Sequence, residues 1–439
     1  MKTTRISNLG PFILLAVIFF IVGFMTTVNG QCQGPLKVSF LANAGELRNT
    51  LATMISFFFF LGYLASGNKG GKWINRHGYK TTLLRGLLVM VAGLFVYFIA
   101  SLFADNFREL VLSIGEDNIP YGFFIFLLGS FLMGSSAALL QTVIIPYISA
   151  YNLPSTQPVQ RVNIVCAVNS FGTTIAPFFV TGILFGGISL DYIQASQLKI
   201  PFIIMALCIV LIWFVVNRQS LPDIKQTRIQ QGEVAERSIW SFRHLKLGVV
   251  AIFFYVGVEV AVGTNVNLHA IELANTGNGL SFLGKQHFIL WGLDLGIPAL
   301  LATLYWTGMM IGRIVSGFFN GISERVLLSA VTTIAIILIS IAILTNNLWA
   351  LVSVGLFHSV MWGCIFTLAV KGLKKYTSKA SGVFMTGVFG GATIPILQGV
   401  LADLLGSWQW TWLIIIVCEL VILYYALYGC RIREEELDF

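Results

Sequence analysis

The chain has 439 residues, of which 56% are hydrophobic and only 10% are charged. Soluble globular proteins carry about 25% charged residues, so this composition excludes that class and predicts an integral membrane protein. The formal net charge of +8 does not indicate a nucleic-acid partner, because the basic residues lie in short segments between apolar runs, where they retain those segments on the cytoplasmic side.

Twelve apolar runs follow one another along the chain, and each is about long enough to cross a bilayer as a helix, which takes roughly 20 residues. The first run admits a second interpretation as a signal peptide. Its length, the lack of a small-residue cleavage site and the later runs favour a first membrane helix. The predicted spans are Pro11–Gly30, Thr50–Ser66, Leu83–Phe103, Gly122–Tyr151, Ile164–Gly187, Pro201–Val216, Leu247–Ala270, Pro298–Phe319, Val326–Leu344, Leu348–Val370, Ser381–Leu401 and Trp410–Tyr428.

A long polar segment, residues 217–246, divides these runs into two sets of six and carries six basic residues. We therefore expect two domains, residues 1–216 and 247–439, joined by a cytoplasmic linker. Short echoes support a duplication: FFIVG at Phe19–Gly23 matches FFYVG at Phe253–Gly257. The expected fold is all-α, with twelve transmembrane helices in two pseudo-symmetric six-helix bundles.

The distribution of basic residues predicts the orientation of the chain. With the N-terminus inside, 21 of the 27 Lys and Arg residues fall in the tails and cytoplasmic loops, five fall outside, and Arg313 lies within span 8 near its inner end. This bias places both termini in the cytoplasm. We expect a multi-pass protein of the cytoplasmic (inner) membrane, monomeric and surrounded by lipid.

The segment between spans 2 and 3, GKWINRHGYK from Gly71 to Lys80, resembles the loop motif G-x-x-x-D-R-x-G-R-K of the major facilitator superfamily. The resemblance implies a role in switching between inward and outward states, although Asn75 replaces the usual Asp. The alternative is a basic turn that only holds topology. Together with Arg313, the conformational-gating candidates are Gly71, Asn75, Arg76, Gly78 and Lys80.

Glu259 is the main candidate for proton coupling, because an ionisable residue inside a membrane span is costly and usually functional. Tyr255, Gly263 and Asn267 recur at four-residue intervals on the same side of the predicted helix. A carboxylate removed from water can bind a proton near physiological pH. The alternative is a structural acid paired with Arg or Lys on a neighbouring helix. Glu419 in span 12 is interpreted as structural, since outer helices of such bundles often face lipid.

Several polar and aromatic side chains inside spans are suited to a sugar. Amides can bond its hydroxyls, and aromatic rings can cover its apolar face. His358 can titrate or bond a hydroxyl, although a lone histidine on an apolar helix is more often satisfied by a neighbour. The substrate-binding candidates are Asn29, Gln141, Asn169, Tyr255, Asn267, Tyr305, His358 and Trp362.

Five segments together resemble the fucose–galactose–hexose symporter family. They are Gly23–Gly30, Leu139–Thr142 with Pro146-Tyr147, Tyr255–Val260, Tyr305-Trp306 with Gly312-Arg313, and Gly390–Asp403. The resemblance covers nearly the whole chain and implies uptake of a monosaccharide with a cation, usually a proton.

Departures from the family pattern place this chain near its glucose/galactose and N-acetylglucosamine branch. The fucose branch has acids where this chain has Gly30 and Gln141, so by the resemblance Glu259 takes the coupling role. Ile145, His358 and Gly363 also differ from the family, and the outer segment 272–297 is longer than expected. These differences indicate an altered sugar site.

The sequence predicts no enzyme, no cofactor and no metal site. The six cysteines show no paired spacing, and no GxxxxGK[ST] motif for nucleotides is present. The expected function is proton-coupled import of a hexose or N-acetylhexosamine. The alternatives are a sodium-coupled or uniport sugar carrier, a drug:proton antiporter, suggested by Gly172–Pro177, and a receptor or lipid scaffold that does not transport.

Overall fold

The computed structural model describes residues 2–41, 45–107, 109–114, 117–151, 153, 158–184, 195–219, 221, 238–277, 280–281, 287–290, 293–316, 322–373, 380 and 383–432. Among them, eleven helices are long and apolar enough to span a membrane. A shorter apolar stretch, Ile164–Phe178, continues in a π-helical turn, η2 (Phe179–Leu184). These twelve segments coincide with the twelve predicted runs and confirm the fold class. Helices form because apolar runs in lipid must satisfy their backbone groups internally.

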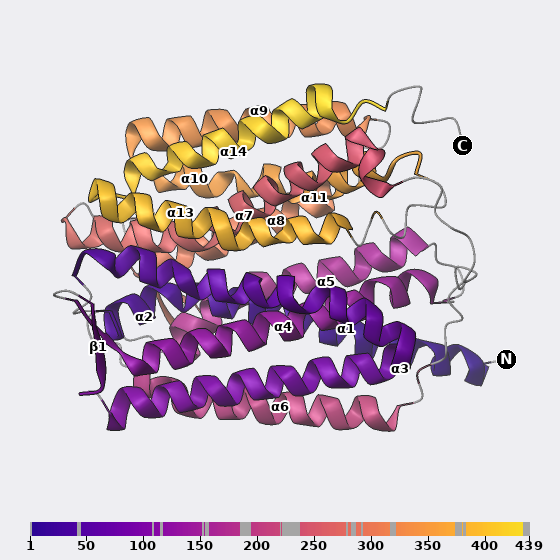
Figure 1. The fold of residues 1–439 in the computed structure, drawn as a ribbon, viewed down its shortest axis with the longest axis horizontal. Helices are drawn as coiled ribbons and strands as arrows, with labels where there is room; N and C mark the ends of the chain where they lie inside the picture. The colour runs from indigo at the N-terminus through magenta and orange to yellow at the C-terminus, as the bar shows by residue number, and fades with distance from the viewer. Residues whose placement is uncertain are drawn as a thin grey trace.

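The helices of the first part of the chain pack on one another (Figure 1). We call them the N-terminal half. Its elements are α1 (Lys2–Gln31), α2 (Gln33–Ser39), η1 (Gly45–Leu47), α3 (Arg48–Asn106), β1 (Val111–Ile114), β2 (Asp117–Pro120), α4 (Tyr121–Ala150), α5 (Pro158–Phe178), η2, η4 (Ala195–Leu198) and α6 (Lys199–Arg218).

The C-terminal half lies beside it and runs from salmon to yellow in Figure 1. Its elements are η5 (Ile239–Ser241), α7 (Arg243–Asn275), β3 (His287–Leu290), β4 (Leu293–Gly296), α8 (Ile297–Ser316), α9 (Glu324–Thr345), α10 (Leu348–Ser353), α11 (Gly355–Val370), η7 (Met385–Phe389), α13 (Gly390–Leu405), η8 (Gln409–Trp412), α14 (Leu413–Tyr424) and η9 (Tyr425–Gly429). Most of the predicted linker, residues 222–237, lies outside the described residues.

The two ends of the molecule differ. Two antiparallel hairpins, β1–β2 and β3–β4, connect spans at one end, which we call the hairpin end. At the other end α1 begins and the chain leaves α14 and η9, as Figure 1 shows; we call this the terminal end. The hairpin β3–β4 occupies part of the long segment 272–297, so this connection contains a folded element at residues 287–290 and 293–296.

The segment predicted as a loop between spans 2 and 3 is largely helical, which corrects that expectation. Helical geometry continues from α3 through Gly71 and Lys80, and only Gly78 departs from it, with φ +80° and ψ 172°. Glycine alone adopts this backbone geometry readily. One residue therefore reverses the chain between two spans.

Glycines set how closely helices approach within each half. A Cβ built on Gly134 of α4 would lie 1.7 Å from the Phe59 carbonyl oxygen of α3. A Cβ on Gly390 would lie 1.7 Å from the carbonyl oxygen of Phe253 in α7. Both contacts are with backbone, which cannot move aside as a side chain can. Each half is therefore packed at a spacing that admits no added methyl group at these positions.

Candidate functional site

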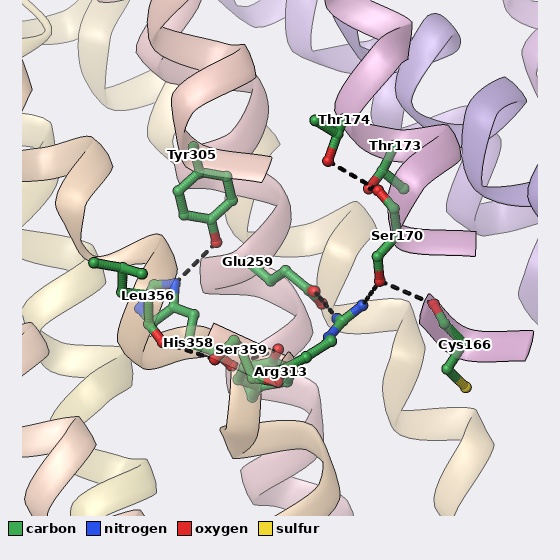
Figure 2. Close-up of polar contacts among 11 residues, drawn as sticks. Cys166, Ser170, Thr173, Thr174, Glu259, Tyr305, Arg313, Leu356, His358 and Ser359 are labelled. Atoms are coloured by element: carbon green, nitrogen blue, oxygen red, sulfur yellow. Dashed lines mark hydrogen bonds and ion pairs between the residues drawn. The ribbon is translucent and has the colours of Figure 1, made fainter. Parts of the chain in front are cut away.

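Glu259 of α7 and Arg313 of α8 form an ion pair in the interior of the helix bundle, with 3.6 Å between Oε1 and Nη2 (Figure 2). Glu259 is 16% exposed and Arg313 is 33% exposed. All residues of α7 from Tyr255 to Ile271 except Glu259 are buried. Glu259 is therefore the one residue of this stretch of α7 that remains partly accessible.

Arg313 also contacts both halves of the protein. Its Nη1 donates a hydrogen bond to the Ser170 hydroxyl of α5, and its Nε lies 3.4 Å from the Ser359 carbonyl oxygen of α11 (Figure 2). At 3.6 Å, the contact with Glu259 is longer than a hydrogen bond of 2.7–3.2 Å. The guanidinium is thus anchored by neutral oxygens and balanced electrostatically by Glu259.

A second polar group lies beside this pair and is fully buried. His358 of α11 contacts Tyr305 of α8 through Nδ1 at 2.9 Å and Glu419 of α14 through Nε2 at 2.9 Å. Both His358 and Glu419 are 0% exposed. The Tyr255 hydroxyl donates to the His358 carbonyl oxygen at 3.0 Å. Glu419, which was interpreted from the sequence as structural, points into the C-terminal half and contacts this histidine rather than lipid.

The structure brings four predicted residues, Tyr255, Glu259, Tyr305 and His358, together with Arg313. The residues predicted on one side of α7, from Tyr255 to Asn267 at four-residue intervals, do not share one environment, however. Tyr255 is fully buried, whereas Asn267 lies near the hairpin end and donates to Gln31 Oε1 at 3.3 Å. A helical face several turns long therefore passes from one environment to another.

The predicted amides of the N-terminal half have partners of their own. Asn29 is buried and accepts hydrogen bonds from Ser130, at 2.8 Å, and from the Tyr97 hydroxyl. Gln141 is half-buried and donates to the Tyr63 hydroxyl at 2.9 Å. Asn29 is thus committed to helix packing, while Gln141 keeps an accessible side.

The two remaining substrate candidates, Asn169 and Trp362, are close in sequence to Ser170 and Ser359, which contact Arg313. Asn169 of α5 donates to the Phe19 carbonyl oxygen of α1 at 2.7 Å and remains partly accessible. Trp362 of α11 stacks on Phe366, with ring centroids 5.4 Å apart and planes 12° apart. Figure 2 shows the side of α5 that faces the C-terminal half, where Ser170 meets Arg313.

The gating candidates lie at the terminal end, apart from Arg313. Lys80 Nζ donates to the Asn217 carbonyl oxygen at the end of α6, at 2.8 Å. Arg76 is exposed, and the Asn75 side chain lies outside the described residues. This segment therefore ties α3 to α6.

Sequence reasoning missed Ser170, Ser359 and the His358–Glu419 contact. The two serines give no signal in a chain with many small polar residues. The buried acid in span 12 gave a signal, because an isolated carboxylate in an apolar helix needs a partner. Within the described residues, no group of three or more His, Cys, Asp or Glu side chains could hold a metal ion.

A helical membrane protein of two packed halves, with an interior ion pair in one half whose guanidinium also hydrogen-bonds to the other half, has the architecture of a secondary transporter. The family model of the Major Facilitator Superfamily matches residues 16–394. The chain is 30% identical over 449 residues to the "Putative glucose/galactose transporter" of Helicobacter pylori (strain J99), covering 99% of each chain. It is 29% identical over 424 residues to the "Glucose/galactose transporter" of Brucella abortus biovar 1, covering 95% of this chain and 93% of the relative.

A solved structure shares the fold: the E. coli fucose:proton symporter FucP superposes with a TM-score of 0.62 at 20% identity, covering 96% of this chain and 99% of that one. The chain belongs to the Major Facilitator Superfamily and, within it, to the fucose–galactose–hexose symporter family. It is a multi-pass membrane transporter rather than an enzyme.

Proposed function

We propose that this protein is a secondary active transporter that imports a monosaccharide, a hexose or an N-acetylhexosamine, together with a proton. The names of its relatives support the substrate class. The observation that carries the mechanism is the ion pair between Glu259 and Arg313, since it combines a partly accessible carboxylate with a guanidinium that contacts the other half. No cofactor is required, because the ion gradient drives the cycle.

The pair gives a direct route from proton binding to movement of the halves. When Glu259 binds a proton, Arg313 loses its counter-charge. The guanidinium then depends on Ser170 and on the Ser359 carbonyl oxygen alone. Because Ser170 belongs to the N-terminal half, this change alters a contact between the halves. Proton uptake and the alternation of access are thereby linked through one side chain.

The same geometry favours a proton over sodium as the coupling ion. A sodium ion needs several oxygen ligands and a local excess of negative charge. Here the Arg313 guanidinium lies 3.6 Å from the Glu259 carboxylate. A cation placed beside Glu259 would be repelled by the guanidinium, whereas a proton neutralises the carboxylate without occupying further space.

For the sugar, we propose the accessible polar and aromatic groups on both sides of the ion pair. Gln141 and Asn169 each donate one side-chain amide hydrogen to an acceptor in the protein, and each side chain remains partly accessible. Trp362 is partly accessible and stacked by Phe366, so its orientation is fixed. Rings held in this way can cover the apolar face of a pyranose.

The contacts between the halves define the conformational state. At the hairpin end, Asp403 of α13 accepts from the Asn49 and Thr50 amides of α3 at 3.1 and 2.7 Å. Gln31 of α1 donates to the Gly263 carbonyl oxygen of α7 at 2.9 Å. We propose that the hairpin end is the outer end, as the excess of basic residues at the terminal end supports. The structure then corresponds to a state with its outer end closed.

Counterflow in proteoliposomes tests the function. Vesicles loaded with one unlabelled monosaccharide at a time should take up the labelled form, and an inward proton gradient should drive uphill uptake. One proton moving through 100 mV supplies about 2.3 kcal/mol, enough for roughly fiftyfold accumulation of a neutral sugar.

Two variants make this test specific. Glu259→Gln should keep counterflow and lose uphill uptake, because the neutral amide mimics the protonated acid. The matched control is Glu272→Gln, which removes a carboxylate from the same helix at the hairpin end, where it bonds Trp408 and Ser407. If Glu259→Gln accumulates sugar as the wild type does, the coupling assignment is wrong. If no monosaccharide exchanges in the wild type, the substrate class is wrong.

A further inference from the structure

A groove lies between α9 and the last helical segment, η9, on the outside of the C-terminal half. α9 packs against α14 and η9, and Figure 1 shows α9 and α14 along the outer edge of this half. The groove has a volume of about 700 Å³, within the range of about 300–1,000 Å³ that is typical of small-ligand sites. Its lining includes Ser323, Arg325, Val326, Ala330, Ile334 and Leu427. Because Val326, Ile334 and Leu427 are exposed, the groove opens to the lipid that surrounds the protein in a membrane.

The groove is about as long as one leaflet of a bilayer is thick. Its lining on α9 extends from Ser323 to Ile334, and at about 1.5 Å per residue this stretch is about 16 Å long. Half of a hydrocarbon core of about 30 Å is about 15 Å. Arg325 lies at the terminal end of the groove, and the lining further along α9 includes Ala330 and Ile334. One acyl chain of a lipid therefore fits along the groove when the lipid headgroup lies beside Arg325.

The guanidinium of Arg325 is held in place by backbone oxygens. Its Nε donates to the Ala426 carbonyl oxygen at 3.1 Å, and its Nη2 donates to the Leu427 carbonyl oxygen at 2.6 Å. Both acceptors belong to η9, so the side chain of α9 is fixed against the end of the neighbouring helix. A guanidinium carries five N–H donors, and these two bonds leave others for an anion. The planar guanidinium is well suited to a phosphate, which it can bind through two parallel hydrogen bonds.

Two further basic residues lie near Arg325 at this end of the groove. Burial raises the pKa of the Cys430 thiol, which follows the last span, and the positive charges of Arg325, Arg431 and Lys371 act against that shift. All three cations are therefore close to one point. Among the described residues, no carboxylate forms an ion pair with any of them, and the neighbouring acid, Glu324, does not line the groove. The uncompensated positive charge favours an anion.

The combination of an apolar groove and a basic end distinguishes among membrane lipids. Every phospholipid offers acyl chains and a phosphate. A zwitterionic headgroup also carries an ammonium, which Arg325, Arg431 and Lys371 repel. An anionic headgroup carries no such opposing charge, and each basic residue near an anionic membrane surface contributes about 1 kcal/mol to its attraction. The groove therefore matches an anionic phospholipid better than a zwitterionic one with the same chains.

We propose that this groove is a binding site for one anionic phospholipid, whose phosphate is held by Arg325 and whose acyl chain lies along Ala330 and Ile334. The inference does not depend on the proposed sugar transport or on any titration. Because Arg325 joins α9 to the end of η9, the phosphate is bound where two outer helices of the C-terminal half meet. A lipid bound only by the folded protein stabilises it by mass action, so the bound lipid strengthens this contact.

The experiment is native mass spectrometry of the full chain in detergent, with phosphatidylglycerol and phosphatidylcholine of identical acyl chains added in equal amounts. The wild type should retain one phosphatidylglycerol in preference to phosphatidylcholine. Arg325→Gln should weaken phosphatidylglycerol binding about five- to tenfold, which is what one basic residue contributes, and Arg325→Lys should keep most of the preference. Ala330→Leu should weaken binding of the lipid without touching Arg325, because the added side chain fills the groove.

Two matched variants serve as controls and should bind phosphatidylglycerol as the wild type does. Arg218→Gln removes a basic residue at the end of α6, where it lies over the Phe214 ring, and Ala65→Leu adds the same bulk at an exposed position of α3.

The unfolding temperature gives a second readout. Phosphatidylglycerol should raise it in the wild type and in both controls, and should raise it less in Arg325→Gln and Ala330→Leu. Equal retention of the two lipids by the wild type, or unchanged phosphatidylglycerol binding in both groove variants, would overturn the proposal. If inorganic phosphate alone displaces the lipid and raises the unfolding temperature equally, the groove binds a free anion and the lipid assignment is wrong.

Discussion

Replacing Asp403 by alanine should shift the protein toward a state in which the hairpin end is open. The Asp403 carboxylate caps the first turn of α3 from the opposite half. It accepts from the amides of Asn49 and Thr50, and from the Thr50 hydroxyl at 2.6 Å. These contacts exist only while the two halves meet at this end. Their loss therefore lowers the stability of the closed state and leaves the open state, in which water solvates the carboxylate, nearly unchanged.

The size of the shift follows from the capping geometry. Exchanging a capping side chain for alanine costs about 0.5–2 kcal/mol, and a carboxylate at a helix N-terminus adds a favourable interaction with the helix dipole. With three donors engaged, a cost of about 1–2 kcal/mol is expected. This corresponds to about a five- to thirtyfold change in the ratio of closed to open molecules.

Distances between spin labels at the hairpin end measure this ratio. Leu112 on β1 and Leu404 on α13 are exposed and lie on opposite halves, so labels there should move apart in the open state. Gln409→Ala is the matched control, because Gln409 donates to the Ile343 carbonyl oxygen within the C-terminal half. If Asp403→Ala leaves the distance distribution as in Gln409→Ala, the contact does not hold the two halves together.

Three further predictions concern packing and gating. Gly390→Ala should lower the unfolding temperature, because overpacking costs about 1–3 kcal/mol and this backbone contact belongs at the upper end of that range. Gly67→Ala should leave the unfolding temperature unchanged, because the added methyl group meets nothing within 4 Å. Gly78→Ala should cost about 1–3 kcal/mol, because φ +80° with ψ 172° lies in a region that essentially only glycine adopts; if the turn gates, uptake should be impaired more than this loss of stability explains. Arg313→Lys keeps the charge but cannot reach Ser170 and Glu259 with two nitrogens at once, so uphill uptake should fall while expression stays normal; uptake equal to the wild type would exclude a specific role for the guanidinium.

The sequence was sufficient for the architecture because bilayer thickness imposes one strong pattern. Each crossing requires a long apolar run, and the twelve runs are the twelve helical segments of the structure. The helical turn around Gly78 was harder to predict. A basic, glycine-rich segment is typical of a loop, but the turn needs only one residue outside helical geometry.

Side-chain partners could be predicted only in part. Glu259 was identified as unusual, and a basic partner on a neighbouring helix was one of two interpretations, but the sequence did not identify Arg313 as that partner. Ser170 lies 143 residues away from Arg313, and no local pattern links them. The capping role of Asp403 left a usable signal: an acid in the last turn of its own helix opposes that helix dipole, so it indicates a partner elsewhere.

The close approach of helices at Gly134 and Gly390 has a mechanical consequence. Backbone that lies against backbone leaves no compressible layer of side chains at these points. A displacement of one helix therefore displaces its neighbour by nearly the same amount. Each half then resembles a stiff lever whose two arms extend toward opposite membrane surfaces. A small displacement near the middle of such a lever becomes a larger and opposite displacement at its two ends. Stiffness within the halves is what the proposed mechanism requires, since binding of a proton at Glu259 would then move both ends of each half together.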